Sequence, residues 1–596
     1  MGPFEVLSLV CGLALFLYGM DVMGTALKKS AGRKLKTILG NLTSSKFKGF
    51  LLGLGVTAVI QSSSATTVMV VGFVNSGTML LSQAISVILG ANLGTAVTSW
   101  LTALNGIEGG SDATAWLAYL KPDAWMPILA LIGIGLVMFS KKSKHKDTGS
   151  ILMGFAVLMV GMSLMSDAVA GLKNDPSFAS ILTLFSNPIL GVLAGTLLTA
   201  IVQSSSASIG ILQALSVTGA ISFGAAIPII LGQNIGTCVT AMLSSLSANK
   251  NGKRTAVAHL FFNVIGVVFW LGAYYLVGWI LQITNVYDIF ALANSSTINM
   301  WGIAAVHTVF KILAIALMWP FTKLLEKLAC SIVKGDDKKG DEFTSLLDER
   351  LLDTPSVAIE RCRTVACQMA RLSIQPLKKA ILLLRNYNDN EAHEIRDAED
   401  KVDIYEDALG SYLVQLSSKS MPESDSHEVT KLLHMIGDLE RISDHSVNIV
   451  ESAEEIKDKE LVFSPAAREE LNSLYGAINE ILDITEDAFI NADIKKAAVV
   501  EPIEQVVDDL KDEIRRQHII RVQNNQCTIE QGFVLSDILT NLERVSDHCS
   551  NIAGCLIEMS LHDTLDLHNY LHKVKAGSEE YNKSYQTYRT KYAIKK

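Results

Sequence analysis

Long apolar runs fill roughly the first 330 residues of the chain, whereas the remainder mixes apolar positions with closely spaced charges. Seven of these runs are long enough to cross a bilayer as helices. They cover residues 4–24, 79–103, 124–140, 150–168, 221–246, 256–282 and 301–319. We therefore expect a membrane-embedded N-terminal part, followed by amphipathic helices.

Two further apolar runs, at about 49–76 and 191–218, are interrupted near their centres by the same polar tetrad, Gln-Ser-Ser-Ser. The tetrads are Gln61–Ser64 and Gln203–Ser206. This pattern predicts two short half-helices meeting at a polar tip, which is a re-entrant hairpin. Irregular backbone at membrane depth is tolerated only where it is buried in protein or lines a cavity.

The tetrads belong to a longer internal repeat with a constant spacing of 142 residues (61 to 203, 92 to 234). Four blocks recur in register: Gly12–Met20 with Gly154–Met162, Gly49–Ala58 with Gly191–Ala200, the tetrads themselves, and Leu89–Thr95 with Leu231–Thr237. Chance similarity between apolar segments does not hold one register through several blocks, so the repeat indicates duplicated structure.

Clusters of lysine and arginine orient the repeat in the membrane. They lie at Lys28–Lys48, Lys141–Lys146, Lys250–Arg254 and Lys323–Lys339, whereas the loops near 104–123 and 283–300 are acidic or neutral. The positive-inside rule places these clusters in the cytoplasm. The first repeat then contributes three crossings, an odd number, so we expect the second repeat to be inverted, as in secondary transporters.

The hairpin tips and the two repeated Asn-x-Gly-Thr segments, Asn92–Thr95 and Asn234–Thr237, carry polar side chains without charge. We expect the second pair of segments to interrupt their helices, and such uncharged polar residues suit ion binding. Half-helix N-termini attract anions, and half-helix C-termini with hydroxyl oxygens suit Na⁺. The anion-site candidates are Gln61, Ser62, Ser63, Ser64, Gln203, Ser204, Ser205 and Ser206. The Na⁺-site candidates are Thr66, Asn92, Thr95, Ser208, Asn234 and Thr237. The alternative is that these small residues only permit tight helix packing, a role that does not require the same tetrad twice.

These motifs resemble type II sodium–phosphate cotransporters. The likeness rests on Val59–Ser64, Leu89–Thr95, Gly232–Thr237 and Arg254–Asn263, and covers about residues 5–320. It implies Na⁺-coupled symport of inorganic phosphate, with both hairpins holding the substrate. The supply of hydroxyls differs between the copies, since Ala65-Thr66-Thr67 corresponds to Ala207-Ser208-Ile209. The number of Na⁺ ions is therefore open, as is the role of Lys311, an intramembrane lysine that is either functional or snorkelling.

The charged C-terminal part repeats as well. Asp438–Ile449 matches Asn541–Ile552 at a spacing of 103 residues, a size that fits one three-helix bundle per repeat. Carboxylates at i, i+4 share helix faces: Glu399, Asp403, Glu440, Asp444, Glu504, Asp508, Glu543 and Asp547. Such pairs are either solvated helix faces or metal ligands on facing helices.

The signature Glu-Arg-x-Ser-Asp-His-x-x-Asn-Ile, which occurs twice within about residues 350–560, resembles PhoU, a regulator of phosphate signalling. The resemblance implies two three-helix bundles, binding of a divalent or iron-type metal by the acidic pairs, and a regulatory role.

We therefore expect an all-α protein with two inverted transmembrane repeats, each with a re-entrant hairpin, and a cytoplasmic PhoU-like pair of three-helix bundles. The expected division is 1–145 and 146–322 for the repeats, 323–345 for a linker, 346–575 for the PhoU-like domain and 576–596 for a basic tail. The expected function is Na⁺/phosphate symport across the bacterial inner membrane, with phosphate export or membrane-anchored sensing as alternatives.

Some classes are disfavoured. No nucleophile–base arrangement or P-loop indicates an enzyme, and a net charge of −9 without a basic stripe argues against nucleic acid. A homo-oligomer stays possible on sequence grounds.

Overall fold

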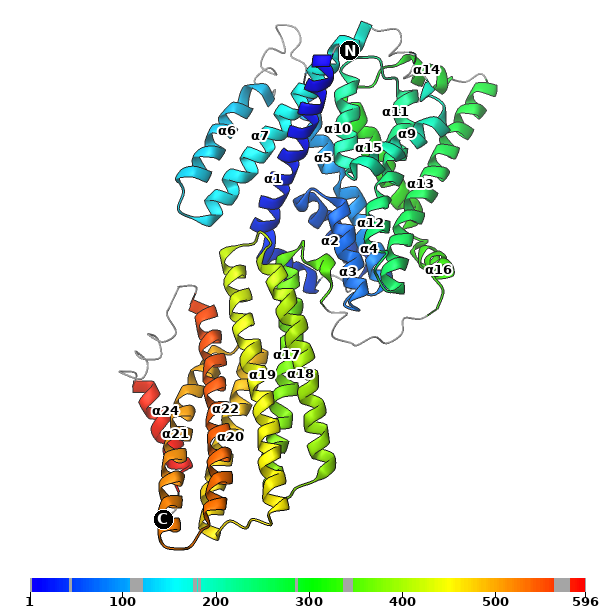
Figure 1. Cartoon of the computed structure of the whole chain (residues 1–596). Helices are drawn as coiled ribbons and strands as arrows, with labels where there is room; N and C mark the ends of the chain where they lie inside the picture. Colours follow the sequence, from blue (N-terminus) through cyan, green and yellow to red (C-terminus); the bar gives the residue numbers. More distant parts are fainter. Residues whose placement is uncertain are drawn as a thin grey trace. The chain divides into compact units, whose positions relative to one another are not determined.

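The computed structural model describes residues 3–41, 45–107, 122–174, 180, 184–284, 288–335, 347–561 and 579–594. These residues are helical, and the only β pairing among them is an isolated antiparallel bridge between Ser222 and Thr297. The chain divides into a first unit, Met1–Val357 with Ser420–Pro422, and a second unit, Ala358–Lys419 with Glu423–Lys596. Figure 1 traces both units.

The helices of the first unit are numbered along the chain in Figure 1. They are α1 Pro3–Asn41, α2 Lys46–Ile60, α3 Ser63–Asn75, α4 Leu81–Gly94, α5 Ala96–Ala103, η1 Leu104–Gly106, α6 Pro122–Phe139, α7 Ser143–Ala170, η3 Gly171–Asn174, α9 Pro188–Val202, α10 Ser205–Ser216, α11 Phe223–Gly236, α12 Cys238–Ser244, α13 Lys250–Ile283, α14 Ile289–Ser295, α15 Met300–Met318, α16 Thr322–Ile332 and η4 Glu349–Leu351.

The internal repeat of the sequence is also a repeat of helices. Helices α2, α3, α4 and α5 begin at residues 46, 63, 81 and 96, and α9, α10, α11 and α12 begin 142 residues later, at 188, 205, 223 and 238. We call these sets the first copy and the second copy. In both, a helical hairpin (α2–α3 or α9–α10) precedes a helix pair that is interrupted at a threonine, Thr95 or Thr237.

Repeated glycines let the helices of each copy pack in close contact. A Cβ atom on Gly53 of α2 would lie 1.9 Å from the carbonyl oxygen of Val87 on α4, and one on Gly195 of α9 would lie 2.1 Å from that of Ile229 on α11. These distances leave no room for a side chain, so the hairpin of each copy is fixed against its own interrupted helix pair.

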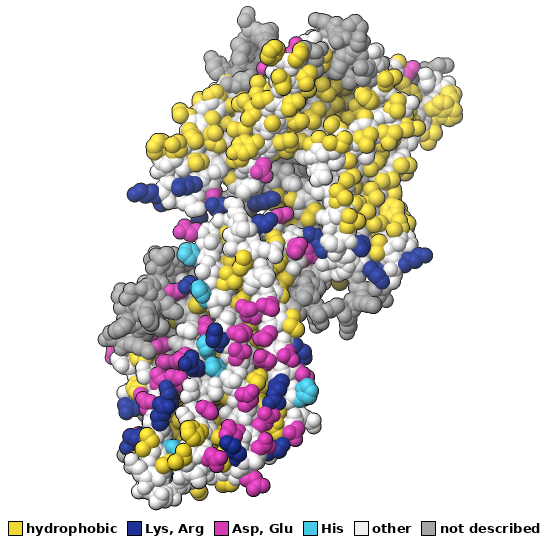
Figure 2. Space-filling view, viewed as in Figure 1, with side chains coloured by type: hydrophobic (Ala, Val, Ile, Leu, Met, Phe, Trp, Pro, Cys, Tyr) yellow, Lys and Arg dark blue, Asp and Glu magenta, His cyan; other side chains and the backbone are white. Residues whose placement is uncertain are grey.

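Six helical segments of the described residues are long and apolar enough to cross a membrane: Pro3–Ser30, Leu81–Gly106, Ser143–Ala170, Phe223–Ser244, Lys250–Ile283 and Met300–Met318. The run expected as a crossing at 124–140 corresponds to the shorter apolar helix Ala124–Phe139. Space-filling side chains in Figure 2 show the first unit covered mainly by apolar groups and the second unit by charged ones. These features are those of a multi-pass membrane protein.

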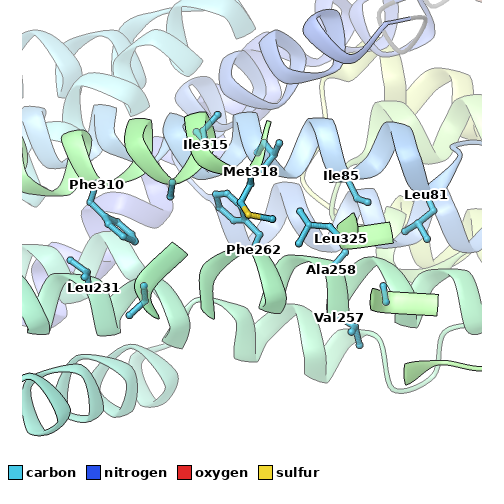
Figure 3. Close-up of a cluster of buried hydrophobic side chains, with 14 residues drawn as sticks. Leu81, Ile85, Leu231, Val257, Ala258, Phe262, Phe310, Ile315, Met318 and Leu325 are labelled. Atoms are coloured by element: carbon cyan, nitrogen blue, oxygen red, sulfur yellow. The ribbon is translucent and has the colours of Figure 1, made fainter. Parts of the chain in front are cut away.

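An apolar core joins the two copies to the later helices. Leu81 and Ile85 of α4, Phe262 of α13, and Phe310 and Met318 of α15 belong to one buried cluster. Figure 3 shows these side chains spread along the cluster between the helices, with Phe262 and Met318 near the centre of the view and Phe310 and Leu81 toward its two ends. The core positions α15 beside the interrupted helices of the first copy.

The second unit contains two successive sets of three long helices and a C-terminal helix. They are α17 Pro355–Leu383, α18 Asp389–Ser417 and α19 Glu423–Asp458, then α20 Pro465–Asn491, α21 Ile494–Gln523 and α22 Ile529–Leu561, and finally α24 Glu579–Lys591. This matches the expectation of one three-helix set per sequence repeat.

The repeated C-terminal signature joins α19 to α22. His445 Nδ1 lies 2.9 Å from Asn541 Oδ1, and His548 Nδ1 lies 2.9 Å from Asp438 Oδ1. The two histidine rings stack with their centroids 5.7 Å apart. Asp438 and Asn541 are the first residues of the two matching stretches, 438–449 and 541–552. Because each histidine contacts the first residue of the other stretch, these histidines hold the two helix sets together.

The first unit extends past residue 322, where the second repeat was expected to end, and past the linker expected at 323–345. Its last described segment, 347–354, which we call the strap, contains η4 and packs on α3. Residues 336–345 of the expected linker, the loop residues 108–121 and the tail residues 576–578 and 595–596 lie outside the described residues.

Candidate functional site

The tetrads form two tips with the same backbone. Gln61 and Gln203 end α2 and α9 in the left-handed conformation, with φ of 60° and 55°. Ser62 and Ser204 then cap α3 and α10, each accepting a hydrogen bond at 3.2 Å from the N–H of the residue three positions on. A left-handed residue followed by an N-cap reverses the chain within one residue, so the next two serines open the new helix.

The first turn of α3 and of α10 is suited to an anion. Ser63 and Ser64, like Ser205 and Ser206, lie at the start of a helix, where backbone N–H groups have no intrahelical acceptor. The positive end of the helix dipole adds to this effect. Ser63 and Ser205 are buried, so an anion held there would be removed from water.

A hydroxyl pair stabilises each tip from behind. Thr57 Oγ1 donates to Thr66 Oγ1 at 3.0 Å in the first copy, and Thr199 Oγ1 donates to Ser208 Oγ at 2.9 Å in the second. Thr66 also donates to the carbonyl oxygen of Ser62 at 3.0 Å. The predicted Na⁺ ligands Thr66 and Ser208 therefore lie directly behind the serines of their own tip.

The two tips differ in how the glutamine is held. Thr98 Oγ1 of α5 donates to Gln61 Oε1 at 2.7 Å, which ties the first tip to its own interrupted helix pair. Thr240 holds the equivalent position in the second copy, but its buried hydroxyl has no hydrogen-bond partner among the described residues. The second tip therefore lacks the anchor that the first tip has.

The interrupted helices place the remaining Na⁺ candidates. Asn92 and Asn234 are buried, and their side-chain amides donate to the carbonyl oxygens of Ile88 and Ile230 at 3.1 and 2.8 Å. Thr95 and Thr237 occupy the interruptions themselves, and their hydroxyls donate back to the carbonyls four residues earlier.

Gln233 brings the second interruption and the second tip together. Its Nε2 donates to the carbonyl oxygen of Ser208 at 3.0 Å, and its Oε1 has no hydrogen-bond partner among the described residues, although the side chain is 1 % exposed. A buried carbonyl oxygen without a donor is a ready ligand for a small cation. No hydrogen bond or ion pair among the described residues joins one tetrad directly to the other.

A cavity of about 180 Å³ lies beside the first tip. Its lining combines the tip residue Ser64 with Lys28 of α1, Thr240 of α12, and Arg350 and Asp353 of the strap. The cavity is therefore lined by both apolar and polar groups, and the charged side chains beside the tip are two cations and one carboxylate.

The strap is bound to the ends of α3 in the first copy and α12 in the second copy by a compact polar network. Arg350 pairs with Asp348 through two hydrogen bonds of 2.7 and 2.8 Å and donates to the carbonyl oxygen of Ser244 at 2.9 Å. Asp348 Oδ2 also accepts from the amide of Asn75, the last residue of α3, at 2.7 Å. Leu351 is fully buried beside Gly72 of α3. The strap thus clamps the far end of the hairpin whose other end carries the tip.

Lys311 of α15 lies in the interior of the first unit, and its Nζ donates to the backbone carbonyl oxygen of Asn92 at 2.6 Å. Ser99 Oγ lies 3.2 Å from Nδ1 of His307, one turn earlier on α15. Lys311 therefore does not snorkel to the membrane surface, and it contacts the interruption that the sequence analysis selected for Na⁺.

In the second unit, one set of acidic candidates converges. Carboxylate oxygens of Glu399 and Asp403 on α18 and of Asp444 on α19 lie within 4.8 Å of one another. Partial burial and the adjacent Asp444 raise the pKa of Glu440 to about 7, and burial followed by neighbouring carboxylates raises the pKa of Glu399 and Asp403. No lysine or arginine among the described residues forms an ion pair with Glu399, Asp403 or Asp444, and carboxylates held this close fit a metal ion.

The second set of acidic candidates, which contains Glu543 and Asp547, includes a lysine side chain, Lys511. Lys511 Nζ of α21 donates to Glu543 Oε1 at 2.8 Å, and its charge also acts on Asp508 and Asp547. Burial and Glu543 raise the pKa of Asp547. Counted from the paired carboxylates, Lys511 occupies the place that Glu406 has in the first set. The two sets are therefore not equivalent.

The sequence analysis did not select Thr98, Gln233, Lys28, Arg350 or Lys511. Gln233 was visible in the repeat, because it replaces Ala91 beside the shared Asn-x-Gly-Thr. The other contacts join distant parts of the chain and leave no local signal.

Comparison with known proteins identifies two families along the chain. The profile of the Na⁺/Pi-cotransporter family matches two stretches, 15–167 and 158–286, and the PhoU domain matches 366–453 and 471–556. The chain is 24% identical to YjbB of Salmonella typhimurium, which is named for inorganic phosphate export, over 93% of this chain and 97% of the relative.

Two further relatives match the membrane part. The uncharacterized protein YqeW of Bacillus subtilis is 32% identical over 44% of this chain and 80% of the relative. The sodium-dependent phosphate transport protein 2A of Mus musculus is 23% identical over 43% of this chain and 59% of the relative. No solved structure matches the chain significantly.

Proposed function

The chain belongs to the Na⁺/Pi-cotransporter family, and from this we propose that it carries inorganic phosphate across the cytoplasmic membrane in a Na⁺-coupled cycle. The observation that carries the proposal is the pair of matching tips, each made of a left-handed glutamine, a capping serine and two serines that open a helix. The family transports its substrate and is not a family of enzymes.

Phosphate would bind the N–H groups and hydroxyls of the tips. A dianion at the start of a helix gains from both the free N–H groups and the dipole, and the serine hydroxyls replace water as donors. Lys28 and Arg350 line the cavity beside Ser64, although Arg350 is paired with Asp348 and the lining also contains Asp353. Lys28 would therefore be the main cationic group facing phosphate at the first tip.

The two copies would face opposite sides of the membrane as inverted repeats with re-entrant hairpins. The basic clusters of the sequence support this orientation, which puts the strap and the second unit in the cytoplasm. Alternating exposure of the two tips would then move phosphate across the inner membrane.

Sodium would bind on the side of the tips away from phosphate. Thr66, Ser208 and the interrupted helices supply hydroxyl and carbonyl oxygens there, and Gln233 adds a buried oxygen without a donor. The name of the mouse relative, a sodium-dependent phosphate transport protein, supports this coupling.

Net phosphate export is a second candidate for the direction of transport. The observation that favours it is the likeness to YjbB, which extends over both units and 97% of that protein's length. The tips and their cation ligands serve either direction, because the direction depends on the ion gradients.

The second unit would regulate the first through the strap. The strap leads directly into α17 at Pro355 and is clamped to α3 by Asp348 and Leu351. A displacement of α17 would therefore be transmitted through the strap to the first hairpin. A divalent or iron-type metal at Glu399, Asp403 and Asp444, with Glu440 and Glu406 nearby, would alter the conformation of α18 and α19 and so provide a signal.

The test is phosphate flux in proteoliposomes that contain the purified full chain. Labelled phosphate should enter when Na⁺ is high outside and leave when the Na⁺ gradient is reversed, and K⁺ at the same concentration should drive neither. Flux that is the same in Na⁺ and K⁺ would overturn Na⁺ coupling, and flux in one direction only would favour export or import alone.

A further inference from the structure

Lys311 is a cationic side chain placed at a helix interruption. It is 4 % exposed, and its Nζ lies 2.6 Å from the backbone carbonyl oxygen of Asn92, near the C-terminal end of α4. The adjacent Phe310 points into the apolar cluster of Figure 3. The C-terminal end of a helix carries partial negative charge and attracts cations.

The ammonium group has no acidic partner in its surroundings. The helices packed on α15 are α4, α5, α10, α11 and α13, and none of them contains an aspartate or glutamate. The titratable groups around Lys311 are Cys238, His259 and His307. Among the described residues no carboxylate lies within ion-pair distance of its Nζ. Lysines inside membranes pair with carboxylates or with backbone carbonyls, and here only the carbonyl is present.

The second copy offers the same carbonyl without a lysine. Asn234 is equivalent to Asn92, and its carbonyl oxygen accepts only a weak contact of 3.8 Å from the thiol of Cys238, which replaces Ala96. The neighbouring Gln233 contributes the buried Oε1 that has no donor among the described residues. Cys238, at the start of α12, is also near Lys311, but the ammonium group donates its hydrogen bond to the first interruption. The second interruption presents uncharged oxygens without a lysine bonded to them.

We propose that Lys311 takes the place of a sodium ion at the first interruption, so that sodium binding at the interruptions is confined to the second copy. An ammonium group and Na⁺ both satisfy a carbonyl oxygen at a helix end, but the lysine is covalently attached and is not released with the substrate. Lys311 therefore supplies charge without adding to the number of Na⁺ ions moved. This inference rests on the proposed Na⁺-coupled function and specifies which copy binds the ion.

Two substitutions of the lysine separate this role from packing. Lys311→Ala removes the ammonium group and opens space at the Asn92 carbonyl, so Na⁺ and water can enter. Lys311→Met fills the same space with an uncharged side chain, so neither the ammonium group nor Na⁺ lies at the Asn92 carbonyl. Lys323→Ala, an exposed lysine on α16, is the matched control, and Gln233→Ala removes the oxygen expected to bind Na⁺ in the second copy.

The first measurement is thermal unfolding of the purified full chain in NaCl and in N-methyl-D-glucamine chloride. Na⁺ should stabilise Lys311→Ala more than the wild type, and should stabilise Gln233→Ala less, because ligand binding to the native state raises its stability. This readout scores Na⁺ binding without transport. Equal Na⁺ stabilisation of the wild type and Lys311→Ala would overturn the inference, as would the lack of a Na⁺ effect in both.

The second measurement is the number of Na⁺ ions moved per phosphate. It is obtained in proteoliposomes from the phosphate gradient that stops net flux at a known Na⁺ gradient. Lys311→Ala should move about one more Na⁺ per phosphate than the wild type, and Lys311→Met should lose about tenfold or more of its uptake. Wild-type stoichiometry and rate in Lys311→Met would overturn the inference and leave the lysine a packing residue. Wild-type uptake that ignores Na⁺ would instead defeat the proposed function, and the unfolding measurement would still decide the role of Lys311.

Discussion

The first and second copies have the same tip in different surroundings. Both tips turn at a left-handed glutamine, and both are backed by a hydroxyl pair. Only the first copy has the Thr98 anchor, the strap on its hairpin and Lys311 on its interruption. Among the described residues, the second copy has buried side-chain oxygens without hydrogen-bond partners at Gln233 and Thr240, and the first copy has one at Thr67. The two copies thus share the tip that we propose binds phosphate and differ in the contacts around it.

The largest expected effect is the loss of phosphate uptake when a serine is removed from the tip, which both copies share. Ser63→Ala and Ser205→Ala each remove a buried hydroxyl from an anion site, and a hydrogen bond to a charged group contributes about 1.5–3 kcal/mol. Phosphate uptake should fall about 10- to 100-fold in both variants. Initial rates in proteoliposomes at matched protein content provide the measurement.

The exposed Ser331→Ala on α16 is the control for these serines and should transport normally. A large loss in one tip variant and none in the other would show that the tips are not equivalent binding elements.

A smaller effect is expected where the anchors differ. Thr98→Val removes the donor to Gln61 Oε1 and should lower uptake about fivefold, because a neutral hydrogen bond contributes about 1 kcal/mol. Thr240→Val has the same shape change at the equivalent position but breaks no hydrogen bond in the structure. Its uptake should stay within about twofold of wild type. Similar losses in both variants would argue against a tip anchored in only one copy.

A substitution in the strap tests whether the contacts of the strap restrain the movement of the first hairpin. Asp348→Ala removes the acceptor of both Asn75 and Arg350 and should raise the maximal uptake rate about threefold, with little change in the phosphate KM, because the hairpin is released rather than rebuilt. Glu349→Ala, exposed in the same turn, should behave as wild type. An unchanged maximal rate in Asp348→Ala would remove the strap from the account of regulation.

The smallest expected effect concerns the two acidic sets of the second unit, which also differ although the sequence repeats. Among the described residues, the set containing Glu440 has no equivalent of the Lys511–Glu543 ion pair. The pKa of Glu440 is raised, so the folded state binds its proton more tightly than the unfolded state, and stability falls as pH rises from about 4.5 to about 7. Glu440→Gln should therefore stabilise the metal-free protein at pH 8 by about 1 kcal/mol, after allowance for solvent screening.

Glu543→Gln is the matched substitution in the set that already contains Lys511. It breaks an ion pair and should lower the stability slightly at the same pH. Thermal unfolding of the full chain with a chelator compares the two. Stabilisation by Glu543→Gln, or destabilisation by Glu440→Gln, would contradict the assignment of the cation-free set to metal binding.

The sequence was enough to locate what is local or repeated. The tetrads, the interruptions at Thr95 and Thr237 and the constant spacing are written in short stretches, so the helix pattern of both copies followed from them. The first-unit boundary at Val357 lies past the linker expected at 323–345, because the strap folds back on α3 through contacts at Asp348 and Leu351 that no local pattern contains.

Long-range contacts set the limits of the sequence analysis. Lys311 was visible as an intramembrane lysine, but its partner lies 219 positions away along the chain. The asymmetry of the acidic sets depends likewise on Lys511, an ordinary surface residue by its local pattern. The roles of the tip and interruption residues stay predictions until ligands are measured.

Binding of labelled phosphate to the purified full chain tests the central claim most directly. A scintillation proximity assay in NaCl and in KCl, on the wild type, Ser63→Ala and Ser205→Ala, measures the tips without requiring transport. We predict saturable binding by the wild type that requires Na⁺ and is lost in both variants. Undiminished, Na⁺-dependent binding in either variant would contradict the claim that both tips hold the phosphate.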